Sequence, residues 1–121
     1  MTESKASDSQ LADDAHENAA EAFVERARAA CGEELKGLYV FGSTISGEAT
    51  GLASDVDVLV VLADEDRETV ADRLRDLAYD VMIEYGPVVE LHVLSASTFE
   101  RYQREGNPFV ERVLSEGRAY V

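Results

Sequence analysis

The sequence is short of cysteine and of long apolar runs, and each shortage excludes a class of protein. Cys31 is the only cysteine among 121 residues, so the chain cannot form an intrachain disulfide. No apolar run approaches the length of a membrane-spanning helix, and the N-terminal residues lack the apolar core of a secretory signal. These absences predict a cytoplasmic protein without a membrane partner.

Positive charge is also scarce. The chain carries 25 Asp and Glu against 11 Lys and Arg, which gives a formal net charge of −14, and its only lysines are Lys5 and Lys36. Binding to nucleic acid needs clustered Lys and Arg, so nucleic acid is not an expected partner. An acidic, lysine-poor surface is typical of proteins kept soluble in concentrated salt, where self-repulsion is screened. We therefore expect a halophilic source; an acidic surface that binds a partner is the alternative.

The length of the chain is enough for one domain. Residues 1–13 are small, polar and acidic and are predicted to be disordered, which leaves residues 14–121 as the single domain. His16 is expected at the surface of the first helix. Residue periodicity predicts helices over about 14–31, 64–85, 97–102 and 108–114, strands over 38–41, 55–62 and 88–94, and an extended end over 116–121.

The most informative part of the sequence is the stretch from Gly37 to Leu62. It contains an apolar strand ending at Phe41, a break at Gly42–Ser43, and a second apolar strand that opens with Asp55 and Asp57. Because side chains alternate across a strand, Asp55 and Asp57 project from one face, about 7 Å apart along the chain. Two neighbouring carboxylates repel each other, and such pairs are usually kept because a divalent cation lies between them.

These residues resemble the signature of the nucleotidyltransferase superfamily, which contains DNA polymerase beta and the minimal nucleotidyltransferases. The signature is an apolar residue, Gly, Gly or Ser, a spacer of roughly nine to thirteen residues, then Asp, apolar, Asp or Glu, apolar. This chain has Phe41, Gly42 and Ser43, eleven spacer residues, and then Asp55–Val58. The C-terminal third is also similar to minimal nucleotidyltransferases. The resemblance implies an α/β (α+β) fold, with a small mixed sheet flanked by helices.

The resemblance also implies roles for particular residues. Asp55 and Asp57 would be ligands of a two-metal Mg²⁺ site, and Glu90 on the third strand would complete the first metal site and help to deprotonate the acceptor. Gly42 and Ser43 would hold the β- and γ-phosphates of an NTP, most simply ATP, at the start of a helix. A nucleotidyl group would then pass to a hydroxyl, with release of pyrophosphate.

The order of strand, helix and strand favours a right-handed crossover, so the third predicted strand should lie near the second. This third strand leaves two assignments open. Glu90 and His92 stand two residues apart and share a face of this strand. Glu90 is the acidic residue available opposite the aspartate pair, but a solvent-facing strand residue is the alternative interpretation. His92 is either a substrate contact or, as is more frequent, a half-exposed strand histidine.

The sequence also leaves alternatives for the partner of this chain. Many relatives carry arginines after Gly-Ser, whereas this chain has Thr44 and Ser46, so Arg67, Arg101 or a partner would have to supply positive charge. Minimal nucleotidyltransferases often act beside a HEPN-type toxin, which implies a toxin–antitoxin role in which AMP is added to a tyrosine of the toxin. The alternatives are a catalytically weak module that neutralises its partner by contact alone, and a homo-oligomer that forms the acceptor pocket.

Overall fold

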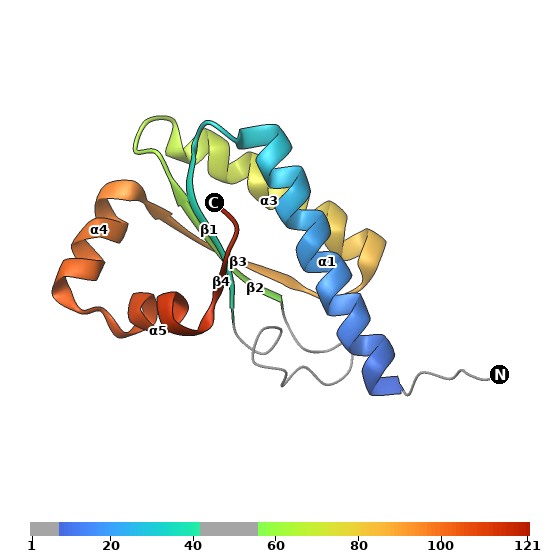
Figure 1. Ribbon diagram of the computed structural model, residues 1–121. Helices are drawn as coiled ribbons and strands as arrows, with labels where there is room; N and C mark the ends of the chain where they lie inside the picture. The colour runs from blue at the N-terminus through green and yellow to red at the C-terminus, as the bar shows by residue number, and fades with distance from the viewer. Residues whose placement is uncertain (1–7, 42–55) are drawn as a thin grey trace.

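A computed structural model of the chain describes residues 8–41 and 56–121, with side chains described from Ala15 onward. The elements, in chain order, are α1 (Asp8–Cys31), β1 (Leu35–Phe41), β2 (Val56–Leu62), α3 (Arg67–Tyr85), β3 (Val89–Ser95), α4 (Ala96–Glu105), α5 (Pro108–Glu116) and β4 (Arg118–Ala119) (Figure 1). The predicted α+β class is confirmed. No helix in the described part is long and apolar enough to cross a membrane.

The described strands form one mixed sheet in the order β3-β2-β1-β4. β1 pairs antiparallel with β2 and β4, whereas β2 and β3 run parallel. The parallel pair results from the succession of strand, helix and strand, because a helical crossover returns the chain to the sheet in the same direction. The third strand therefore lies beside the second, as predicted, and β2 lies between β1 and β3.

Helices cover both faces of the sheet (Figure 1). On one face, Phe23 of α1 and Leu74 of α3 pack with Val58 and Val60 of β2 in the larger core cluster. On the other face, Leu59 and Val61 belong to a smaller cluster that also contains Val113 of α5. Because successive residues of a strand face opposite sides, the odd-numbered residues of β2 face α4 and α5. We call this side of the sheet the α4/α5 face.

The first helix differs from its prediction at two points. α1 begins at Asp8, before the predicted start near residue 14, and residues 1–7 lie outside the described part of the chain. Acidic and alanine-rich sequence favours the start of a helix, which accounts for the longer helix. The expectation that His16 lies at the surface is wrong, since His16 is 1% exposed. It shares one helical face with the buried residues Ala20 and Phe23, at spacings of four and seven residues.

The start of α3 also differs in detail from the prediction. The acidic residues 64–66 predict a cap and an acidic first turn for this helix. Asp66 does occupy the N-cap position, but with a φ of 57° and without a side-chain capping hydrogen bond. The carboxylate of Asp64 instead accepts a hydrogen bond from the backbone N–H of Ser97 at 3.2 Å, so it joins the end of β2 to the start of α4. Gly86 ends the helix as predicted.

The C-terminal end completes the sheet. The extended segment that the sequence predicted forms β4, and Tyr120 donates its backbone N–H to the carbonyl of Leu38 at 2.7 Å. The two preceding helices are slightly longer than predicted. They pack on the α4/α5 face, where Phe109 of α5 contacts His92 of β3.

Candidate metal and nucleotide site

Asp57 interrupts an otherwise buried strand. Within β2, every residue except Asp57 is buried, and the Asp57 side chain is 22% exposed. It projects from the α4/α5 face, together with Leu59 and Val61. A carboxylate at the end of a buried apolar strand is held firmly by the backbone while its oxygens still reach water, which is a suitable position for a ligand.

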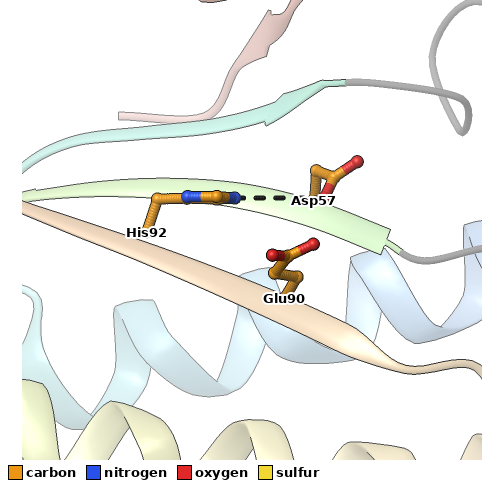
Figure 2. Close-up of side chains that lie close together, drawn as sticks. All are labelled: Asp57, Glu90 and His92. Atoms are coloured by element: carbon orange, nitrogen blue, oxygen red, sulfur yellow. Dashed lines mark ion pairs between the residues drawn. The ribbon is translucent and has the colours of Figure 1, made fainter.

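Neighbouring strands place two further polar side chains beside Asp57. Glu90 is the register partner of Asp57 on the parallel strand β3, and His92 is the partner of Leu59. Both therefore project from the same face as Asp57 (Figure 2). One ligand atom from each of the three side chains lies within 4.8 Å of the others, and His92 Nε2 lies 4.0 Å from Asp57 Oδ1. We call these three side chains the Asp57 cluster.

The His92 ring is held by two aromatic side chains. Its centroid lies 5.5 Å from the ring of Phe41 on β1 and 5.4 Å from the ring of Phe109 on α5. The two phenyl rings also contact each other edge to face, with centroids 5.5 Å apart. Such arrangements are favourable for aromatic groups. The imidazole is consequently restricted in orientation, although the side chain remains 34% exposed.

The N-cap of α5 positions Phe109. The side-chain oxygen of Asn107 accepts hydrogen bonds from the backbone N–H groups of Phe109 at 2.9 Å and Val110 at 3.1 Å. We expect Asn107→Ala to lower the free energy of unfolding by about 1 kcal/mol, because a helix loses its capping acceptor. Urea denaturation measures this. Asn107→Asp keeps an acceptor and should stay close to wild type, and equal losses in the two variants would contradict a capping role.

The donor set of the Asp57 cluster fits a divalent cation. Asp57 and Glu90 supply two carboxylates, the oxygen ligands that Mg²⁺ prefers, and a bound cation would offset their mutual repulsion. Glu90 is exposed, which leaves open positions for water and phosphate. A hollow of about 500 Å³ between α3 and β3 is lined by Glu90 but not by Asp57 or His92.

Several predicted site residues lie outside the described part of the chain: Gly42, Ser43, Thr44, Ser46 and Asp55. The two described arginines suggested for the phosphates contact glutamates. Arg67 lies 3.4 Å from Glu68, and Arg101 lies 4.0 Å from Glu105. Arg67 is the first residue of α3, which follows the C-terminal end of β2, whereas Asp57 lies near the N-terminal end of that strand. The five residue steps from Asp57 to Leu62 span about 17 Å.

Two titratable groups elsewhere have shifted pKa values with structural causes. Burial raises the pKa of the Cys31 thiol, which lies in the larger core cluster, so the thiol stays protonated near neutral pH. The pKa of Arg26 is raised, chiefly by its hydrogen bond to Glu84 at 2.8 Å, which links α1 to α3. Both groups lie in the helical layer on the other face of the sheet.

His92 is a partly exposed strand histidine, which is one of its two predicted interpretations. Phe109 and Asn107 were not among the predicted site residues. The spacing of Glu90 and His92 on one strand was a signal that both share a face. No comparable signal connects His92 with Phe109, because a helix and a turn separate them and only packing brings their rings together.

Comparison with known proteins identifies the family. The sequence profile of the nucleotidyltransferase domain matches residues 19–121, and the chain therefore belongs to the nucleotidyltransferase domain family. A search of curated proteins found no match. One similar solved structure is a crystal structure of a protein from Sulfolobus solfataricus that is provisionally named as a nucleotidyltransferase. It has 23% sequence identity to this chain, 84% of each chain is covered, and the TM-score is 0.48. Membership of the family makes nucleotidyl transfer the class of reaction and an NTP the class of substrate.

Proposed function

We propose that this chain is a Mg²⁺-dependent nucleotidyltransferase of the minimal type, which transfers AMP from ATP to a hydroxyl acceptor. The observation that carries the proposal is the pairing of Asp57 with Glu90. They are register partners on neighbouring strands, and their carboxylates lie within 4.8 Å of each other on an accessible face. In a chain of this family, two such carboxylates suit a cation that also binds the phosphates of a nucleotide.

We assign separate roles to the residues of the site. Asp57 and Glu90 would hold the ion, together with Asp55 from the sequence motif. When bound, Mg²⁺ neutralises charge on the phosphates and favours ionisation of the acceptor hydroxyl. The acceptor oxygen forms a bond to the α-phosphorus, and the bond from that phosphorus to the bridging oxygen breaks, so pyrophosphate leaves with the electron pair. An Oε atom of Glu90 accepts the proton of the acceptor hydroxyl.

The phosphate side of the site is proposed from the sequence motif. Backbone N–H groups at Gly42 and the hydroxyl of Ser43 would hold the β- and γ-phosphates. With Thr44 and Ser46 in place of the usual arginines, we expect the free protein to bind NTP weakly unless the cation is present. A partner protein could add positive charge to the site.

The acceptor that we propose is a tyrosine of a HEPN-type partner protein, which gives the chain an antitoxin role. The exposure of Glu90 supports a macromolecular acceptor, because a side chain of another protein can reach an exposed carboxylate. The family match covers residues 19–121, so most of this chain is the transferase domain itself. The acidic composition supports a halophilic source and suits a partner with a positively charged surface.

Calorimetric titration of ATP, GTP, CTP and UTP in molar KCl tests the nucleotide site. We expect binding that requires Mg²⁺, with ATP preferred, and Glu90→Gln should weaken it by about tenfold because one anionic ligand is lost. Glu100→Gln removes an exposed carboxylate from α4 and serves as the matched control, with unchanged affinity. Equal ATP binding with Mg²⁺ and with EDTA would contradict the proposal.

A second assay separates catalysis from neutralisation by contact. The variant that combines Asp55→Asn with Asp57→Asn is mixed with the partner, and the toxicity of the partner is measured. We expect the variant to lose neutralisation, because AMP is no longer transferred. Full neutralisation by the variant would instead identify a binding module that acts by contact.

A further inference from the structure

We propose that His92 is a further protein ligand of the cation, beside Asp57 and Glu90, and that it gives the site a preference for a transition-metal ion that accepts nitrogen over Mg²⁺. The inference rests on the proposed function, since it concerns the same ion. It concerns a residue of this chain that the nucleotidyltransferase signature does not contain.

The distances within the Asp57 cluster carry the first step. His92 Nε2 lies 4.0 Å from Asp57 Oδ1, and the ligand atoms of Asp57, Glu90 and His92 all lie within 4.8 Å of one another. When two ligand atoms each lie roughly 2.1 Å from the same ion, they are about 3 Å apart if they occupy adjacent positions and about 4.2 Å apart if they lie on opposite sides of the ion. The three donor atoms are thus already near the spacing that a single ion imposes, and small side-chain rotations complete it.

The aromatic contacts of His92 carry the second step. Phe41 and Phe109 both contact the imidazole, and Figure 2 shows the ring directed from β3 toward Asp57. A ligand whose orientation is restricted before binding loses less conformational entropy when the ion arrives. An unconstrained surface histidine would lack this advantage. The packing around His92 therefore favours ligation as well as burial of the ring.

The chemistry of the donor set gives the preference. Mg²⁺ selects oxygen ligands, whereas imidazole nitrogen binds first-row transition metals well. The two carboxylates and the imidazole of the Asp57 cluster form a mixed set that both classes of ion can occupy, with the nitrogen contributing mainly to the transition metal. Removal of the imidazole should consequently affect the two classes of ion unequally.

Mn²⁺ is a suitable probe, because pulsed electron paramagnetic resonance detects nitrogen bound to it. We expect the wild-type protein with Mn²⁺ to show a nitrogen coupling that changes from ¹⁴N to ¹⁵N when histidine is selectively labelled. His92→Gln should abolish the histidine coupling. The other histidine of the chain, His16, is 1% exposed on α1 and serves as an internal control, because its label remains in the variant.

Calorimetry of the free ions provides the second measurement. We expect His92→Gln to weaken Mn²⁺ binding by about tenfold and Mg²⁺ binding by less than about twofold. Mn²⁺ bound without histidine coupling in the wild type would overturn the inference and leave the proposed function in place. Clear coupling in a protein that transfers no nucleotide would support the inference and contradict the proposed function. Equal losses for the two ions would overturn the preference.

Discussion

Asp57→Asn should reduce nucleotidyl transfer by about a thousandfold, because the loss of roughly 4 kcal/mol of transition-state stabilisation corresponds to that factor. Asp57 lies between Phe41 and Glu90 in the register of the sheet and is directed at the proposed ion position. The amide keeps the shape of the side chain but removes its charge. Transfer of label from ATP labelled at the α-phosphate, measured at saturating Mg²⁺, gives the rate.

The fold of this variant should survive. The Asp57 side chain is partly exposed, and loss of its charge also relieves repulsion with Glu90. We therefore expect the free energy of unfolding of the metal-free variant to stay within about 1 kcal/mol of wild type. Asp76→Asn, on the exposed face of α3, is the matched control and should keep full activity. A folded Asp57→Asn variant with wild-type transfer would refute a role for this carboxylate.

Phe23→Ala should lower the free energy of unfolding by about 3 to 5 kcal/mol, the usual cost of removing a buried phenyl ring. Phe23 is fully buried in the larger core cluster, where α1 packs against α3 and the sheet. Single domains are stable by about 5 to 15 kcal/mol, so this loss is a large share of the total. Urea denaturation in molar KCl measures the change while the charge repulsion of the acidic chain stays screened.

Phe23→Leu is the matched control, because it keeps an apolar side chain in the same space. It should lose clearly less stability than Phe23→Ala, since a smaller cavity remains. If both variants lose less than about 1 kcal/mol, α1 does not pack on the sheet as described. Measurement at a second salt concentration separates this packing effect from screening of surface charge.

Much of the fold could be predicted from local pattern. The alternation of side chains along a strand predicted that Asp55 and Asp57 project from one face of the second strand. Asp55 lies outside the described residues, and Asp57 projects from the α4/α5 face with Leu59 and Val61. The order of strand, helix and strand predicted that β3 lies beside β2, which is the step that brings Glu90 next to Asp57. Both predictions depend on backbone geometry, which follows from the local sequence without knowledge of contacts to the rest of the chain.

The burial of His16 shows where local pattern is insufficient. The sequence around it is rich in alanine, so several faces of α1 are apolar enough to pack, and the sheet determines which one does. His16 is buried on the face that contains Phe23, and the prediction that it lies at the surface was wrong for this reason. The tertiary structure therefore determines which face of a weakly amphipathic helix is buried.

The sequence by itself determined the family signature, the acidic character and the succession of helices and strands that places two carboxylates on neighbouring strands. Only the tertiary structure decided that His92 lies 4.0 Å from Asp57, and that Phe41 and Phe109 hold its ring. The physical reason is that periodicity follows from the backbone within one element. Contacts between β1, β3 and α5 depend on register and on packing against shared neighbours, which no single segment specifies.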